Sequence, residues 1–165
     1  MNTKHPPPSA TAKPAVGTPC YTLEATVPSA EIFNAIPKGH NWSLTHDGER
    51  GITCTVYDTQ SNCVAAKFSI TALPGCNRTL LFHSAEVAPH LRGKGYGVKL
   101  HSVRLAWAKA YGATVLLCTV NENNEPQRRI LQREGWHLAE VAQNNDGGDF
   151  GLWVKVLPPS TVYLK

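Results

Sequence analysis

The sequence lacks the long apolar segments of membrane and exported proteins. Its 165 residues include no run of about eighteen apolar residues, the length that a membrane-spanning helix needs. The first residues lack the apolar core of a secretory signal peptide. We therefore expect a protein that has no membrane partner and resides in the cytoplasm.

Patterns for binding metal or nucleic acid are missing as well. The five cysteines include no Cys-x-x-Cys pair, and the seven histidines add no partner at zinc-finger spacing. This predicts reduced thiols and no metal ion. The net charge of +4 comes without the dense basic patch and stacking aromatics typical of nucleic-acid-binding domains, and it suits a polyanionic cofactor. We expect no nucleic-acid partner.

The residues that are present fit one compact domain with a tail. The chain is 42% hydrophobic and long enough for one sizeable core, but hardly for two. Residues 1–19 hold five prolines, two lysines and little that could pack, which indicates a flexible tail. We predict a single α/β domain over residues 20–165, present as a monomer or a homodimer.

The most informative stretch is Arg-Gly-Lys-Gly-Tyr-Gly at residues 92–97. Upstream, residues 80–88 have the composition of a strand that Pro89 ends. Downstream, apolar residues recur at helical spacing until a capping glycine; they are Leu100, Val103, Trp107 and Ala110, followed by Gly112. A glycine loop between a strand and the first turn of a helix lets backbone N–H groups approach an anion. The pattern indicates a phosphate-binding loop.

Periodicity and turn residues predict the remaining elements. Residues 113–120 form an almost uninterrupted apolar strand, expected to be covered on both faces and to run parallel to the earlier one. A second helix runs from a capping Asn124 to Gly135. Further strands are expected at 21–27, 51–57, 63–72, 136–141 and 152–156, with a helix at 29–36. The result is a mixed β-sheet with helices on both faces.

Other phosphate-binding loops fit less well. A dinucleotide-binding turn needs its third glycine three positions beyond the second, but Gly93, Gly95 and Gly97 are evenly spaced and Val98 occupies the required position. A Walker-type loop fails because no Gly-Lys-Ser/Thr follows. Contact of the basic loop with nucleic acid is a further alternative, which salt-dependent binding would reveal.

Three motifs in this order resemble the GNAT superfamily of acyl-CoA-dependent N-acetyltransferases. The family's loop reads Arg/Gln-x-x-Gly-x-Gly/Ala, which residues 92–97 match. The Val-Ala-Pro strand end at 87–89 is similar to the family's Val-x-Val/Pro. Asn124 stands eleven residues before a Gly-Trp pair at 135–136, as the family's asparagine does before its Gly-aromatic pair. The firm resemblance covers about residues 80–138.

The resemblance implies a GNAT-like fold and acetyl-CoA as the acetyl donor. In this fold a strongly twisted mixed sheet has central parallel strands that splay apart and admit the pantetheine arm. The loop would bind the pyrophosphate, and a backbone N–H near Val87 would polarise the acetyl carbonyl. The implied cofactor-binding residues are Val87, Ala88, Pro89, Arg92, Gly93, Lys94, Gly95, Tyr96, Gly97, Asn124 and Arg133.

Acetyl transfer requires a base, because an amine of pKa about 10.4 is almost wholly protonated at pH 7. His83 is the first candidate, since imidazole titrates near neutrality. It stands nine residues before Arg92, as the working histidine of arylalkylamine acetyltransferases does, and simple alternation places it on the strand face of Val87. Glu86 is the second candidate through a raised pKa, although alternation places it on the opposite face unless a bulge intervenes.

One position departs from the family: Leu131 replaces the general-acid tyrosine four residues before the Gly-aromatic pair. CoA would then leave unaided as a thiolate, or Tyr96, Cys118 or a water would supply the proton. We predict acetyl transfer to a primary amine of a small molecule or a protein, by direct attack in a ternary complex. The alternative is a non-catalytic CoA-binding domain with a sensing or partner-docking role.

Overall fold

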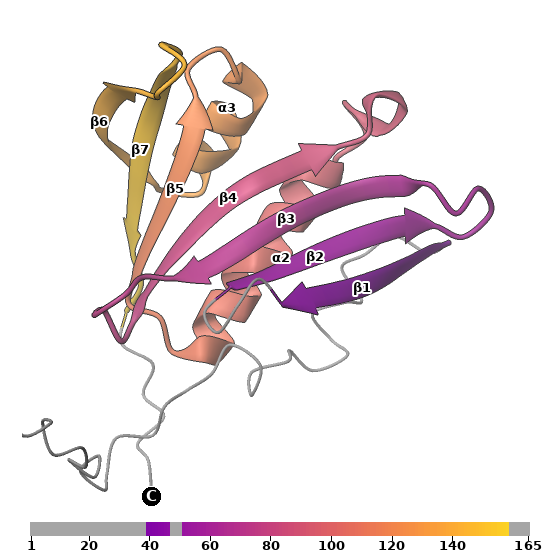
Figure 1. Cartoon of the computed structure of the whole chain (residues 1–165), viewed down its shortest axis with the longest axis horizontal. Helices are drawn as coiled ribbons and strands as arrows, with labels where there is room; N and C mark the ends of the chain where they lie inside the picture. Colours follow the sequence, from indigo (N-terminus) through magenta and orange to yellow (C-terminus); the bar gives the residue numbers. More distant parts are fainter. Residues whose placement is uncertain (1–38, 47–50, 159–165) are drawn as a thin grey trace, which may run out of the picture.

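The computed structural model describes residues 39–46 and 51–158, which form one mixed β-sheet of seven strands with two α-helices (Figure 1). The elements in chain order are β1 His40–His46, β2 Gly51–Asp58, β3 Val64–Ala72, β4 Thr79–Val87, the 3₁₀ turn η2 Pro89–Leu91, α2 Tyr96–Tyr111, β5 Val115–Asn121, α3 Glu125–Arg133, β6 His137–Gln143 and β7 Asp149–Val156. The predicted tail, the strand at 21–27 and the helix at 29–36 lie outside the described residues.

The described strands are ordered β1-β2-β3-β4-β5-β7-β6, and among them only the central pair, β4 with β5, is parallel. That pairing is short, joining Thr79–Phe82 to Val115–Cys118. Beyond it the two strands diverge, as Figure 1 shows. The splay expected of the central parallel strands is therefore confirmed. It leaves the second half of β4 with an edge that no described strand pairs with.

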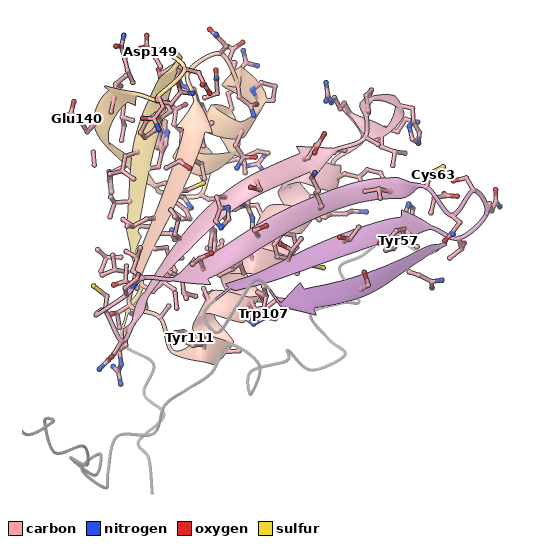
Figure 2. The ribbon with its side chains drawn as sticks, viewed as in Figure 1. Tyr57, Cys63, Trp107, Tyr111, Glu140 and Asp149 are labelled. Atoms are coloured by element: carbon pink, nitrogen blue, oxygen red, sulfur yellow. The ribbon has the colours of Figure 1, made fainter. Side chains whose placement is uncertain are left out.

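The core fills the space between the sheet and α2, which runs behind β3 and β4 in Figure 1. The predicted apolar stripe of α2 is confirmed at Leu100, Val103 and Trp107, all buried. Figure 2 shows Trp107 and Tyr111 near the C-terminal end of this helix. Ala110 is exposed, so its predicted place in the stripe is wrong; at about 100° of rotation per residue it falls at the rim of the stripe.

The ends of both helices follow their predicted capping residues. Gly112 has a φ of 78°, a conformation that strains residues with a side chain, and its N–H reaches the carbonyls of Ala108 and Lys109. The side chain of Asn124 accepts a hydrogen bond of 3.3 Å from the backbone N–H of Gln127 at the start of α3. Within the described ranges, neither helix is long and apolar enough to cross a membrane.

Two parts of the sheet differ from expectation. The polar stretch His40–His46 forms β1, which is at the edge of the described sheet, pairs antiparallel with residues 52–58 of β2, and was not indicated by periodicity. In β5, Leu116, Cys118 and Val120 are buried but Thr119 is exposed, so coverage on both faces fails at its C-terminal end. The three buried residues share one face of β5, whereas Val115, Leu117 and Thr119 share the other, where burial falls from intermediate to exposed along the strand.

The buried face of α2 also carries two polar side chains that sequence reasoning missed. Arg104 and His101 are each only 1% exposed. The Arg104 guanidinium lies over the rings of Phe82 and Phe68, at 5.2 and 6.0 Å from their centroids. The Trp136 indole N–H donates to Nε2 of His101 at 3.1 Å. The helical period could have predicted the burial of both residues, because it places positions 101 and 104 inside the apolar stripe.

Candidate active site

The candidate site lies where β4 leaves the sheet, and a β-bulge shapes it. In the pairing with β3, Glu86 lies opposite Lys67 but His83 lies opposite Ser69, so one residue of β3 faces two of β4. Directly paired residues share a face, and Lys67 and Ser69 lie on the same face of β3. His83 and Glu86 therefore share a face. The placement of His83 on the face of Val87, expected from simple alternation, is wrong.

The open edge of β4 presents backbone groups at Val87. The N–H of Ala88 donates to the carbonyl of Ala65 on β3 at 2.8 Å. Because hydrogen-bonding directions alternate along an antiparallel pair, the N–H and C=O of Val87 point away from β3, toward the splay. The structure thus places an extended strand edge where the pantetheine arm was expected.

The loop after β4 leads directly into a helix whose N-terminus no side chain caps. Gly93 and Gly95 have φ values of 74° and 82°, and Gly95 is the N-cap of α2. A Cβ added at either glycine would meet no atom within 4 Å, so the loop backbone is accessible. The first N–H groups of α2 and the exposed Lys94 give this end of the helix a positive potential that is open to solvent.

Two side chains connect this loop to neighbouring strands. The Nε–H of Arg92 donates to the carbonyl of Val87 at 3.1 Å, which ties the loop to the strand end. The Tyr96 hydroxyl lies 3.4 Å from Nε2 of His40, and the two rings meet edge to face. The loop is therefore fixed to both β4 and β1. Arg92 has a structural contact in addition to the charge that the sequence indicated.

His83 is half-buried, and both of its ring nitrogens have hydroxyl partners. Nε2 lies 2.9 Å from Oγ1 of Thr71, and Nδ1 lies 3.1 Å from Oγ of Ser84. Next to this cluster, Oγ1 of Thr53 and Oγ of Ser69 are 2.7 Å apart. A row of hydroxyl groups thus runs across β2 and β3 toward the histidine.

Glu86 does not have the raised pKa that a carboxylate base needs. Its carboxylate is exposed and lies 2.9 Å from the Lys67 ammonium group. The hydrogen bond and the charge of Lys67 hold the pKa of Glu86 below its usual range, and the charge of Arg92 adds to this effect. The expected pKa direction is therefore wrong, and His83 is the stronger candidate.

The two candidates from the second helix lie at its opposite ends. Asn124 caps α3, and Arg133 is in the last turn, where its Nε lies 3.8 Å from the carboxylate of Glu134. Nine residues of helix separate them by about 13 Å. They could therefore contact only different parts of a long cofactor.

Neither side chain considered for proton donation to the leaving thiol, Tyr96 or Cys118, is suited to it, and Leu131 at the position of the family's general acid has no proton to give. Leu131 is fully buried in the core. Cys118 pairs with Phe82 and is buried on the α2 side of the sheet, opposite the face of His83, and burial raises the pKa of its thiol. The Tyr96 hydroxyl is held by His40.

No metal chemistry is indicated by the described part of the chain, which brings together no three His, Cys, Asp or Glu side chains able to hold an ion. The open strand edge and the uncapped glycine loop at a helix N-terminus suit an extended ligand that carries phosphate groups.

The sequence matches the model of the acetyltransferase (GNAT) family over residues 19–136, and the chain belongs to this family. It is accordingly classed as an acyltransferase, in a family that uses acetyl-CoA.

Solved structures show the same fold. The chain is 18% identical to the ribosomal-protein-S18-alanine N-acetyltransferase of Escherichia coli, with a TM-score of 0.57 over 72% of this chain and 77% of that one. It is 15% identical to spermidine N-acetyltransferase of Vibrio cholerae in complex with CoA and spermine, with a TM-score of 0.56 over 67% and 68%. Nourseothricin acetyltransferase is 21% identical, with a TM-score of 0.57 over 78% and 94%. No curated protein matches the sequence.

Proposed function

We propose that this protein transfers the acetyl group of acetyl-CoA to a primary amine by direct attack in a ternary complex. The observation that carries the proposal is the open edge of β4, which is followed, after η2 and the glycine loop, by the uncapped N-terminus of α2. An extended cofactor with an apolar arm and a diphosphate fits such a strand edge followed by an anion site.

The residues of the loop fit the diphosphate in charge and in space. Arg92 and Lys94 are exposed and positive, and the backbone at Gly93 and Gly95 is uncovered. The Val87 N–H, on the open edge, is suited to polarise the thioester carbonyl. Asn124 and Arg133 would hold other parts of the cofactor.

His83 would act as the base that generates the neutral amine. It stands on β4 between the end of the pairing with β5 and the predicted cofactor edge. Since neither of the two side chains considered as acids, Tyr96 and Cys118, is suited to the task, CoA would leave as a thiolate or take its proton from water.

The acceptor class follows from the family only in outline. Related folds include enzymes named for spermidine, for nourseothricin and for an alanine of ribosomal protein S18. These names define a test panel of three primary-amine acceptors: a polyamine, an antibiotic amine and a peptide that begins with alanine.

Calorimetric titration with acetyl-CoA, CoA and NAD tests the cofactor assignment. We expect micromolar binding of both CoA compounds and none of NAD. Gly95→Glu adds a strained, negative side chain to the loop and should reduce acetyl-CoA affinity by at least about a hundredfold. Gly147→Glu is the matched control, because this glycine has a similar φ of 78° and open surroundings in the β6–β7 loop. Equal affinities in the two variants would disprove the loop assignment.

Thiol release from acetyl-CoA in the presence of the three acceptors tests catalysis. We expect turnover with at least one amine, and His83→Gln should lower kcat about a hundredfold, within the range of general-base catalysis, while the acetyl-CoA Kd stays unchanged. Cofactor binding without turnover of any amine would instead favour the non-catalytic alternative.

A further inference from the structure

The bulge in β4 contains a serine where the backbone favours glycine. Ser84 has a φ of 52°, in the left-handed region that strains residues with a side chain. Among the described non-glycine residues only Asn62 shares a positive φ, and it lies in the β2–β3 turn, where asparagine is common. Strain of this kind concentrates at functional sites. What serine adds over glycine at this position is a hydroxyl group.

That hydroxyl belongs to a chain of three side chains from two strands. Ser84 Oγ lies 3.1 Å from His83 Nδ1, and Thr71 Oγ1 on β3 lies 2.9 Å from His83 Nε2. A neutral imidazole donates from one nitrogen and accepts at the other. When Nε2 carries the proton and donates it to Thr71, Nδ1 is the acceptor and faces the Ser84 hydroxyl.

The position of Ser84 suits contact with an acceptor amine. The residue is exposed, and it lies between Phe82, the last residue paired with β5, and Val87, where the thioester carbonyl is expected. The charged side chains on this face of β3 and β4 are Lys67 and Glu86, and they are paired with each other at 2.9 Å. Neither is therefore a competing base.

We propose that Ser84, His83 and Thr71 form a proton relay for the acceptor amine, an inference that rests on the proposed acetyl transfer. The Ser84 oxygen takes a proton from the substrate ammonium group while its own proton passes to Nδ1 of His83, which becomes imidazolium. The neutral amine nitrogen then forms the C–N bond to the acetyl carbon, and the C–S bond breaks as CoA leaves as a thiolate. The nitrogen gives up its second proton to water, which leaves the neutral amide. The imidazolium proton returns to solvent through Ser84. Thr71 is a positioning residue that selects the Nε2–H tautomer.

The first test separates the hydroxyl from the backbone strain. Ser84→Gly removes the hydroxyl and suits the positive φ, so the Tm should stay unchanged or rise, while kcat/KM for the best acceptor of the panel should fall at least about tenfold. The Kd for acetyl-CoA should stay within about twofold of the wild-type value. Asn62→Gly, the same backbone change in a remote turn, should leave kcat/KM unchanged.

The second test reads the tautomer without requiring turnover. Imidazole ¹⁵N chemical shifts of His83 should show the Nε2–H form in the wild-type protein and in Thr71→Ser, but a mixture of tautomers in Thr71→Val. A wild-type Nδ1–H tautomer, or full activity of Ser84→Gly, would overturn the relay and leave the proposed acetyl transfer intact. A wild-type protein that binds acetyl-CoA but acetylates no amine would refute both.

Discussion

At the scale of single residues, His101 is the group whose protonation the fold opposes most clearly. Burial, reinforced by the positive charges of Arg104, Lys155 and Arg133, lowers its pKa from 6.5 to about 3. Trp136 can only donate a hydrogen bond, so Nε2 of His101 has to accept it and stays unprotonated. The folded state thus contains a neutral histidine, whereas the unfolded chain takes up a proton below pH 6.5.

This difference predicts a pH dependence of stability. The contribution of His101 is fully present above pH 6.5 and is lost as the pH falls toward 3, because the unfolded state then binds the extra proton. Between pH 7 and pH 5 the free energy of unfolding should drop by about 2 kcal/mol in urea titrations. His101→Gln keeps an acceptor for Trp136 without a titrating group and should flatten this change. An equally steep dependence in the variant would assign it to other groups.

Arg104 is a buried cation whose charge the described residues do not balance. Its Nε and Nη1 have no hydrogen-bond partner, and no described carboxylate forms an ion pair with it. Desolvation accordingly lowers its pKa below the usual value. Such a side chain adds packing and ring contacts but carries a desolvation cost.

Replacing this charge with an apolar chain of similar length should therefore not harm the fold. We expect Arg104→Met to leave the free energy of unfolding unchanged or to raise it by about 1–4 kcal/mol. Arg104→Ala is the control and should lower it by about 2–5 kcal/mol, because it leaves a cavity beneath Phe68 and Phe82. A loss in the Met variant as large as in the Ala variant would show that the guanidinium itself stabilises the core.

At the scale of elements, α3 depends on a residue that is also a cofactor candidate. Asn124→Ala should cost about 1 kcal/mol of stability, because the N–H of Gln127 loses its acceptor. Asn124→Asp keeps a capping oxygen and should retain stability, as measured by urea unfolding. If the Asn124 amide also binds acetyl-CoA, the Asp variant should keep its stability but bind acetyl-CoA more weakly. Full stability of the Ala variant would contradict the capping role.

The sequence predicted those elements whose pattern is local. The β2–β3 hairpin, the strand before Pro89, both helices and their capping residues Gly112 and Asn124 follow from periodicity and turn chemistry. The bulge at Ser84 did not, because serine and alanine inside an alternating strand carry no mark of the register shift. Strand β1 was also missed, since pairing with β2 and not its own polar composition makes it a strand.

The same distinction, between local patterns and pairing with distant strands, applies to the candidate site. The glycine loop and His83 could be found because their residue types and spacing carry the chemistry. The partners of His83 could not: Thr71 comes from another strand, and only the β3–β4 register brings it to the imidazole. The lowered pKa of Glu86 likewise depends on Lys67 across the strand pair.

At the scale of the whole molecule, cofactor binding should be visible as stabilisation. A ligand that binds only the folded state adds about 2.7 kcal/mol at a concentration of one hundred times its Kd. For a domain of this size we expect acetyl-CoA to raise the Tm by roughly 5–10 °C in thermal scans. NAD, and acetyl-CoA with Gly95→Glu, are the controls without an expected shift. An equal shift with NAD would show that binding is not selective for CoA.

The short pairing between β4 and β5 is also a weak connection between two parts of the sheet. Within the sheet, four residue pairs join strands β1–β4 to strands β5–β7, whereas β1 and β2 share seven pairs. A transient opening along this junction breaks fewer backbone hydrogen bonds than one between β1 and β2. The two groups of strands would then exchange their amide hydrogens as separate cooperative units. If acetyl-CoA binds between β4 and β5 as proposed, it should slow the exchange in both groups.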